Sequence, residues 1–431
     1  MIKSIVSSDQ FKLIYSKPFQ NLIVNGVRAS AMFAMIKILA VYGGPASLAS
    51  FANFQNLIGL ILILVTLSLQ TGLTIETAKN VVSQRPLMIC ISILFLLIPV
   101  ALLAAYIFLD RLMLVDDLLS ADSYFLYFTI LILPFSVNSL LVASEVGRQR
   151  YSNILVNYVL VGIFPIVTAI FSNDGFLEKI IAGYCFGNWV GAIFLLGRIG
   201  VSPALFFKFN VNKKLAISML RYGVVSGSIG IFTAVTAFTM RQYLSKEVSV
   251  EDAGNWEALV KIGALFQFAI AAPLISTGMP LMVHALKEGP KAIVSLIILR
   301  TKALFILVAL SITISWILAD WIVLLLFSED FLLISPLIVL MILSESFKAF
   351  GGIFILAPMA NQQFGIVLLT YMFSTIGILA GIYLLSALSL LTLPNVTWLY
   401  LSVSFFHAVF ICAWISTWLH RRSEKYLDTI T

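Results

Sequence analysis

The stretch NLIVNGVRASAMFAMIKILAVYGGPASLASFANFQNL, from Asn21 to Leu57, decides the fold. It begins with a membrane-length apolar segment that carries two cations, Arg28 and Lys37. An uncharged turn, Tyr-Gly-Gly-Pro at 42–45, separates this segment from a second apolar one. A charge at bilayer depth costs roughly 2.5–3.5 kcal/mol on insertion scales, so two charges in one segment indicate an anionic partner or a wet cavity.

The composition indicates an all-α polytopic membrane protein. Of the 431 residues, 61% are hydrophobic and 11% are charged, whereas a soluble domain averages roughly 45–50% apolar and about 25% charged residues. Because the longest predicted connections are Gly200–Leu215 and Arg241–Asn255, we expect no soluble catalytic domain between helices. Apolar windows of about 20 residues predict twelve transmembrane helices, at 22–42, 48–71, 87–109, 123–144, 153–172, 178–199, 216–240, 256–279, 301–327, 333–358, 364–388 and 397–419.

The basic residues predict the orientation. With a cytoplasmic N-terminus, nineteen lysines and arginines fall on the cytoplasmic side and four on the far side: Arg111, Lys179, Arg241 and Lys246. This asymmetry is typical of the positive-inside rule, so we expect both termini in the cytoplasm. We expect the net charge of +7 to face the anionic headgroups of membrane lipids and not nucleic acid. We also expect no cleavable signal peptide, because the polar stretch Met1–Gln20 precedes a first apolar segment that is too long for one.

Three short motifs indicate an internal repeat. Gly-Val at 26–27 recurs at 223–224, Ala-Asn-Phe at 52–54 recurs as Gly-Asn-Trp at 254–256, and Thr-Gly-Leu at 71–73 recurs as Thr-Gly-Met at 277–279. We therefore predict two six-helix bundles, at 1–200 and 216–431, joined by a basic cytoplasmic linker at 201–215. Because six is even, the repeat is parallel, with a pseudo-two-fold axis along the membrane normal. Such bundles rock to expose a cavity between them to either side.

Arg28 and Lys37 are the first candidate site residues. Both can instead snorkel to the headgroups, as long side chains near helix ends do. They are nine residues apart, which places them on nearly opposite faces of an ideal helix at about 100° per residue. Both can line one cavity only if this helix is kinked, rotated or wet on two sides.

Further charged residues lie in the later predicted helices. Glu257 and Lys261 have i,i+4 spacing, so a local ion pair can shield both charges. Glu345 and Lys348 lie near mid-membrane, where a cavity location is favoured. Glu76 ends the second predicted helix, at the interface. Each of the three glutamates is a candidate for binding a coupling cation, and the sequence does not rank them.

Gly183, Gly187 and Gly191 recur at four-residue spacing in the sixth predicted helix. Small residues at this spacing let helix backbones approach closely in a membrane. We expect this face to pack against a neighbouring helix.

No motif for catalysis or metal binding is present in the sequence. It contains no Gly-x-x-x-x-Gly-Lys-Ser/Thr phosphate loop and no clustered His/Cys set. The three cysteines, Cys90, Cys185 and Cys412, lie in apolar runs and are interpreted as small packed residues. We interpret the lone histidine of the last predicted helix, His407, as packed. We therefore expect no cofactor, no metal and no enzymatic activity.

The first hairpin carries a family resemblance. The run KILAVYGGPA at 37–46, followed by Ala-Asn-Phe at 52–54, resembles the first hairpin of bacterial Wzx-type flippases. Arg28 falls where those proteins often place another basic residue. Thr-Gly-Leu-Thr at 71–74 resembles their Asn-Gly-Val-Thr run, although Ile75 stands where a lysine can follow.

The second half extends the resemblance over nearly the whole chain. Trp256, and Glu345-x-x-Lys348 followed by Gly351, resemble the second half of the same flippases, especially those for lipid III. The Glu257–Lys261 pair has no counterpart that we can place, so the identity of the carried glycan stays open.

The resemblance implies the multidrug/oligosaccharidyl-lipid/polysaccharide exporter fold in the bacterial cytoplasmic (inner) membrane. It implies a flippase that moves an undecaprenyl-pyrophosphate-linked oligosaccharide, either lipid III of enterobacterial common antigen or an O-antigen unit, to the periplasmic leaflet. Its pathway partners would be a polymerase and a chain-length regulator. A cationic cavity suits a pyrophosphate, through charge-assisted hydrogen bonds at low dielectric.

The candidate site follows from the resemblance and the buried charges together. The predicted substrate-cavity residues are Arg28, Lys37, Asn53, Trp256, Lys261 and Lys348, and the candidate coupling-cation acids are Glu76, Glu257 and Glu345. Two alternatives stay open: a multidrug cation antiporter of the same superfamily, and a membrane polysaccharide polymerase, which would be an enzyme.

Overall fold

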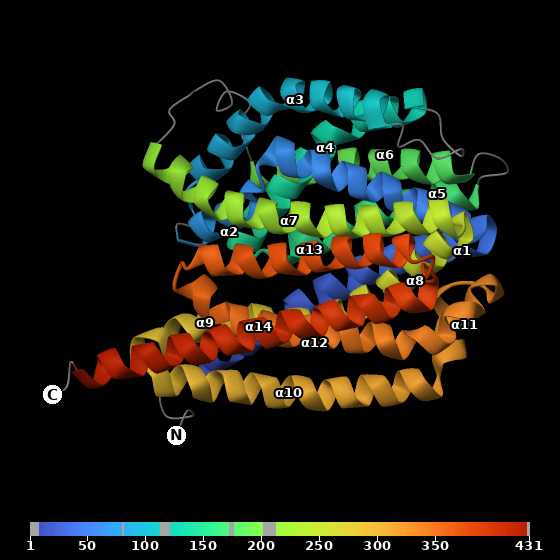
Figure 1. Ribbon diagram of the computed structural model, residues 1–431. Helices are drawn as coiled ribbons and strands as arrows, with labels where there is room; N and C mark the ends of the chain where they lie inside the picture. The colour runs from blue at the N-terminus through green and yellow to red at the C-terminus, as the bar shows by residue number, and fades with distance from the viewer. Residues whose placement is uncertain (1–7, 80–81, 113–120, 172–175, 201–212, 429–431) are drawn as a thin grey trace. The chain divides into compact units, whose positions relative to one another are not determined.

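The computed structural model describes residues 8–79, 82–112, 121–171, 176–200 and 213–428, and within them the chain is helical, with no strand (Figure 1). In chain order the elements are α1 (Ser8–Thr66), α2 (Leu69–Lys79), α3 (Arg85–Leu112), α4 (Ala121–Gly147), α5 (Tyr151–Ile170), α6 (Phe176–Ile199), α7 (Lys213–Glu247), α8 (Val250–Phe266), the π-helix η3 (Gln267–Ala271), α9 (Ala272–Glu288), α10 (Pro290–Ile317), α11 (Ala319–Leu326), the 3-10 helix η4 (Glu329–Leu337), α12 (Ile338–Ala360), α13 (Phe364–Ala387) and α14 (Leu393–Asp428).

Within the described residues, each of the twelve predicted spans falls mainly on helix. In the described part of the chain, nine helices are long and apolar enough to cross a membrane. One of them, α1, contains the first predicted span and residues 48–66 of the second, which ends in α2. The predicted span at 87–109 corresponds to α3, and the one at 256–279 is divided into α8, η3 and α9. The all-α polytopic fold class is therefore confirmed.

The predicted turn at 42–45 is a kink inside α1. Only Gly44 departs from helical geometry there, with φ 63° and ψ −169°. Glycine tolerates a positive φ because it has no Cβ, and Pro45 suits the first position of the helical part that follows. A Cβ built on Gly254, the fifth residue of α8, would lie 2.0 Å from the carbonyl oxygen of Pro45. Glycine at 254 therefore allows α8 to pass the kink closely.

The contacts divide the chain into two compact units. The first comprises residues 1–43 and 50–234, and the second comprises 44–49 and 235–431. Most of the predicted linker, at 201–212, lies outside the described residues. The predicted bundle limits at 200 and 216 therefore stay a prediction.

In the first unit, α5 and α6 pack closely along the predicted glycine face. A Cβ on Gly183, Gly187 or Gly191 would lie within 2.2–2.7 Å of an atom of α5. Each of these glycines therefore sets how closely the two helices approach, as the spacing predicts.

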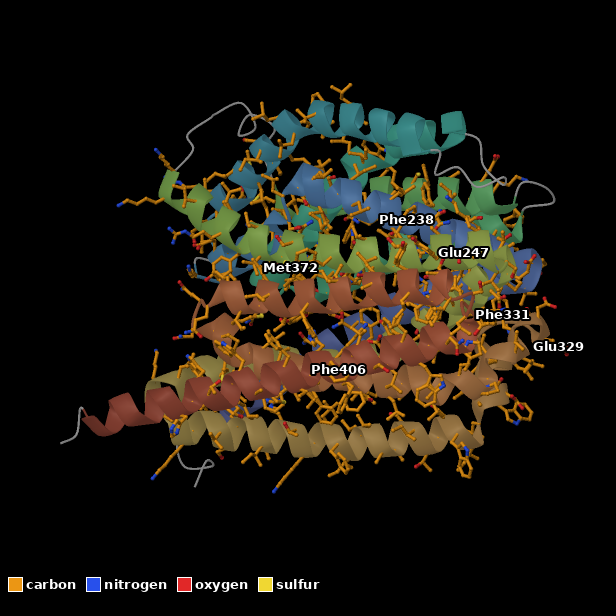
Figure 2. The ribbon with its side chains drawn as sticks, in the orientation of Figure 1. Phe238, Glu247, Glu329, Phe331, Met372 and Phe406 are labelled. Atoms are coloured by element: carbon orange, nitrogen blue, oxygen red, sulfur yellow. The ribbon has the colours of Figure 1, made fainter. Side chains whose placement is uncertain are left out.

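In the second unit, α12 packs against α8, α9, α10 and α14. The connection from α7 to α8 and the helix η4 lie at one end of this unit, where Figure 2 shows Glu247 and Glu329. The α9–α10 connection and the C-terminal end of α14 lie at the opposite end (Figure 1).

The predicted far-side connection Arg241–Asn255 is wrong. Helix α7 continues to Glu247, and α8 begins at Val250 with Ser249 as its N-cap, whose hydroxyl accepts a hydrogen bond from the Asp252 N–H at 2.9 Å. Arg241 is 2% exposed and lies within the helix. The hydropathy pattern predicts that a helix ends at a charged residue. Here a carboxylate from α8 neutralises Arg241, so α7 continues past this residue.

Candidate functional site

A cavity of about 430 Å³ lies in the first unit, between α1, α2, α4, α5 and α6. Aromatic and aliphatic side chains form much of its wall, together with a group of neutral amides and hydroxyls. Arg28 is the only charged residue that lines it in the described part of the chain. The cavity therefore combines one cation with polar groups that can donate or accept hydrogen bonds.

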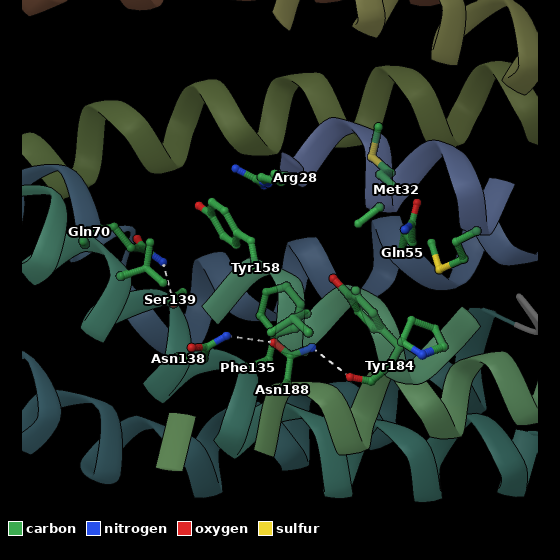
Figure 3. A pocket seen from close by; sticks show the side chains of 17 residues that line it. Arg28, Met32, Gln55, Gln70, Phe135, Asn138, Ser139, Tyr158, Tyr184 and Asn188 are labelled. Carbon is green, nitrogen blue, oxygen red and sulfur yellow. Dashed lines mark hydrogen bonds between the residues drawn. The ribbon is translucent and has the colours of Figure 1, made fainter. Parts of the chain in front are cut away.

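Arg28 lies beside the ring of Tyr158 at this cavity. Its guanidinium carbon is 5.3 Å from the ring centroid, a cation–π distance, and Figure 3 shows the two side chains together. No carboxylate of the described residues forms an ion pair with Arg28. The residue as a whole is exposed. Its guanidinium is thus oriented by an aromatic face, which leaves N–H donors for an anion.

A chain of amides holds the opposite wall in place. Asn157 Nδ2 donates to Asn138 Oδ1 at 2.8 Å, and Asn138 Nδ2 donates to Asn188 Oδ1 at 3.2 Å. Asn188 Nδ2 in turn donates to the Tyr184 carbonyl at 2.9 Å (Figure 3). These bonds join α4, α5 and α6 and fix the direction in which the amide groups face. Hydrogen-bonded amides in a membrane interior give a bundle of this kind its specific packing.

The second unit contains a buried charge cluster. Arg241 Nη1 lies 2.6 Å from Glu257 Oε2, and Lys261 Nζ lies 2.9 Å from Glu257 Oε1. The side chains of Arg241 and Glu257 are each 3% exposed, and that of Lys261 is 13% exposed. The Glu257–Lys261 ion pair is therefore present. Glu257 also contacts a second cation, Arg241, which the sequence predicts to lie in a loop.

A second group of the same unit surrounds Glu345. Gln267 donates to its Oε2 at 2.8 Å, and Tyr400 donates to its Oε1 at 2.8 Å. Lys348 lies 3.1 Å from the same Oε1 and also donates to the Tyr400 hydroxyl. The carboxylate is thus neutralised and hydrogen-bonded within the protein.

The ring of Trp256 joins these two groups. It contacts the Tyr400 ring edge to face, with centroids 5.3 Å apart. A Cβ on Gly263 would lie 2.8 Å from Glu345 Cγ, so α8 approaches the carboxylate side chain directly. Among the described residues of this cluster, each lysine and arginine has a carboxylate partner. We therefore interpret this cluster as one that holds helices together, and not primarily as a binding site for a charged ligand.

The remaining predicted site residues lie outside the cavity of the first unit. Lys37 is partly exposed and does not line it, as expected for a residue on nearly the opposite helix face from Arg28. Asn53 is buried. Glu76 is held by Lys79 and Ser218, each at 2.8 Å. Burial raises the pKa of Glu76, but the hydrogen bonds from these partners outweigh it and the net pKa is lowered.

His407 is 5% exposed, and its Nδ1 lies 3.2 Å from the Thr370 carbonyl oxygen, in line with a packed role. Among the described residues, no group of three or more His, Cys, Asp or Glu side chains is placed to hold a metal ion.

Sequence reasoning missed most of the residues that line the cavity. Asn138, Asn188, Tyr158 and Tyr184 carry no charge, so a search for charges at bilayer depth passes over them. A signal was nevertheless present, because three asparagines within apolar helices at 138, 157 and 188 are costly to bury without partners.

Comparison with protein-family profiles and with curated proteins finds no match. Among solved structures, the chain is similar to an inward-facing multidrug resistance MATE family transporter of the MOP superfamily, with 14% identity, a TM-score of 0.71, and coverage of 95% of this chain and 96% of that one. An outward-facing conformation of such a transporter matches with 14% identity, a TM-score of 0.69, and coverage of 94% and 95%. A MOP superfamily transporter from Pyrococcus furiosus, whose binding pocket is described as having reverse polarity, matches with 12% identity, a TM-score of 0.64, and coverage of 94% and 96%.

These likenesses extend over nearly the full length of both chains, at identities that are informative about the fold alone. Over the residues that the structure describes, this chain has the fold of the MATE transporters of the MOP superfamily.

Proposed function

We propose that this protein is a membrane transporter that flips an undecaprenyl-pyrophosphate-linked oligosaccharide between leaflets. The observation that carries the proposal is Arg28 at the cavity of the first unit, with no carboxylate partner among the described residues. An arginine offers a planar fork of donors that matches phosphate oxygens.

The rest of the cavity suits the sugar end of such a substrate. Asn138, Asn188, Gln70 and Ser139 present amides and a hydroxyl, and aromatic rings lie among them. Neutral donors and acceptors beside aromatic faces bind hydroxylated rings without requiring a charge. A diphosphate joined to a glycan therefore matches the lining at both ends.

The multidrug cation antiporter fits this cavity less well. A cationic substrate favours an acidic side chain at its site, and no described residue that lines the cavity is acidic. The buried acids of the second unit, Glu257 and Glu345, already have cationic partners. For the P. furiosus transporter, a reversed pocket polarity is said to suggest a different function, and we extend the same logic to this chain.

We further propose alternating access as the mechanism. Proteins with this fold are known in inward-facing and outward-facing conformations. For this chain, the glycan would reach the cavity from the cytoplasmic leaflet and leave it toward the periplasmic one. Transport without covalent chemistry separates this proposal from the polymerase alternative, which would require the protein to join glycan units.

Binding of three probes to the purified full chain tests the substrate class: undecaprenyl diphosphate, undecaprenyl monophosphate and the tetraphenylphosphonium cation. We expect the tightest binding for the diphosphate and the weakest for the cation. Tighter binding of the cation would refute the proposal in favour of a drug antiporter. In cells, deletion of the protein should cause undecaprenyl-linked oligosaccharide to accumulate, and an unchanged lipid-linked pool would also count against the proposal.

A further inference from the structure

A second cationic site lies in the first unit, at the ends of α4, α5 and α6. Glu145, in the last turn of α4, is 0% exposed. Arg148 Nη1 lies 3.7 Å and Arg150 Nη1 lies 3.9 Å from its Oε1. Asn153 Nδ2 donates to its Oε2 at 2.5 Å, and Arg198 Nε donates to Asn153 Oδ1 at 3.4 Å.

The charges of this cluster do not balance. Three guanidinium groups stand against one carboxylate among the described residues, which leaves a net charge of +2. Neither arginine–glutamate contact is as short as a hydrogen bond, and Glu145 Oε1 has no hydrogen-bond partner among the described residues. The same is true of Arg148 Nε and Nη2, although the Arg148 side chain is only 3% exposed. Buried charged groups are normally paired and hydrogen-bonded, so the excess of donors favours an anion nearby.

A cavity of about 560 Å³ opens beside these residues. Arg150 and Arg198 line it, and none of its described lining residues is acidic. The Arg150 side chain is 48% exposed, and Arg198 is exposed as well. Both side chains are therefore accessible to a ligand in the cavity. Buried Arg148, which does not line the cavity, also contacts Glu145, so the two lining arginines are incompletely neutralised.

The backbone adds to this positive potential. The first residues of α5, at 151–153, line the cavity, and the 20-residue helix has no side-chain cap and no acidic residue in its first turn. An N-terminus of this kind directs the positive end of the helix dipole toward a ligand. The arginines and the helix end therefore favour the same kind of group, a phosphate.

One wall of the cavity is apolar. Ile23, Val24 and Leu155 line it beside the arginines. A free phosphate ion gains nothing from aliphatic contacts, whereas a phospholipid carries its phosphate next to hydrocarbon. The cavity lies at the helix ends where the sequence predicts the cytoplasmic interface, the depth at which a headgroup phosphate is found.

We propose that this cavity binds the headgroup of an anionic membrane lipid, with Arg150 and Arg198 contacting the phosphate. The site is separate from the Arg28 cavity, shares no lining residue with it and does not depend on which substrate the protein carries.

Native mass spectrometry of the full chain in detergent, with equimolar phosphatidylglycerol and phosphatidylcholine, tests the proposal. We expect the wild type to retain phosphatidylglycerol in preference. The double variant R150Q/R198Q should weaken this retention by roughly fivefold for each arginine removed. The matched control K213Q/K214Q removes the same charge from exposed positions at the start of α7, outside the cavity, and should retain the lipid. Equal retention by R150Q/R198Q and the control would overturn the proposal.

Ser152→Asp provides a test that does not depend on removing arginines. A carboxylate in the first turn of α5 stabilises the helix N-terminus, so this variant should fold at least as well as the wild type. It also places negative charge where the phosphate would lie, so the preference for phosphatidylglycerol should be lost. An unchanged preference in a folded Ser152→Asp protein would contradict the site. Displacement of the lipid by excess inorganic phosphate would reassign the cavity to a soluble phosphate and refute the lipid.

Discussion

Arg241 Nη1 of α7 lies 2.6 Å from Glu257 Oε2 of α8, and each of these side chains is 3% exposed. The two helices are joined by a connection of only two residues, between Glu247 and Val250. The ion pair therefore closes a helical hairpin in the second unit. The same glutamate also binds Lys261, so it contacts both cations.

Glu257→Gln should therefore destabilise the protein more than loss of either cation alone. It removes the carboxylate charge that both cations contact, at a cost of about 3–5 kcal/mol, typical of a broken buried pair. Arg241→Gln and Lys261→Gln each leave Glu257 with one partner and should cost less. Thermal unfolding of the purified variants gives the ranking. A Glu257→Gln protein that is as stable as the two cation variants would show that the pairing contributes little.

Lys348→Ala should destabilise the protein, and a second substitution should restore part of the lost stability. It removes a cation from Glu345 and should cost about 1–3 kcal/mol, less than for a fully buried pair, because the Lys348 side chain is 33% exposed. The double change Glu345→Gln with Lys348→Ala removes the stranded carboxylate and should recover part of the lost stability. A double-mutant cycle measures this coupling. Strictly additive effects would indicate that the two side chains do not interact.

The α5–α6 contact offers a matched pair of glycines. A Cβ on Gly187 would lie 2.7 Å from the Val161 carbonyl oxygen, whereas one on Gly197 of the same helix would meet nothing within 4 Å. Gly187→Ala should therefore push α5 and α6 apart and cost about 1–3 kcal/mol, the range for overpacking a tight contact. Gly197→Ala should be neutral or slightly stabilising, since alanine is the better helix former. Similar melting temperatures for both variants would rule out the close approach.

The predicted orientation can be tested at Lys213, the first residue of α7, and at Asp252, in the first turn of α8 just beyond the other end of α7. Helix α7 has 35 residues and is about 52 Å long, so its ends lie on opposite sides of a membrane that it crosses. In a background without native cysteines, a cysteine at Asp252 should react with an impermeant thiol reagent from outside spheroplasts, and one at Lys213 should not. The reverse pattern would invert the topology.

The helices and their order could be predicted from the sequence, because apolar windows of membrane length are enough to locate them. What could not be predicted lies inside those windows. Arg241 was assigned to a loop because hydropathy treats charge as a boundary, whereas Glu257 neutralises it from the next helix. The π-helix at 267–271 and the 3-10 helix at 329–337 depend on local packing that no periodicity reveals.

Only the charged residues of the candidate site could be predicted from the sequence. Arg28 stood out because no acid lies within a helical turn of it. Tyr158 and Asn188 come from helices far away in the chain, and only the packing of α5 and α6 brings them to the same cavity. Glu145 was overlooked because it ends an apolar helix at the interface, where a carboxylate is ordinary.

Binding of undecaprenyl diphosphate to Arg28 variants tests the central claim most directly. Loss of a hydrogen bond to a charged group costs about 1.5–3 kcal/mol, so Arg28→Ala should weaken binding roughly 10- to 150-fold. Arg28→Lys should recover part of the affinity, because the charge survives although the planar fork is lost. Lys37→Ala, on the same helix but outside the cavity, is the control and should bind nearly as well as the wild type. Unchanged diphosphate affinity in a folded Arg28→Ala protein would contradict the account, and the anion site would then have to lie elsewhere.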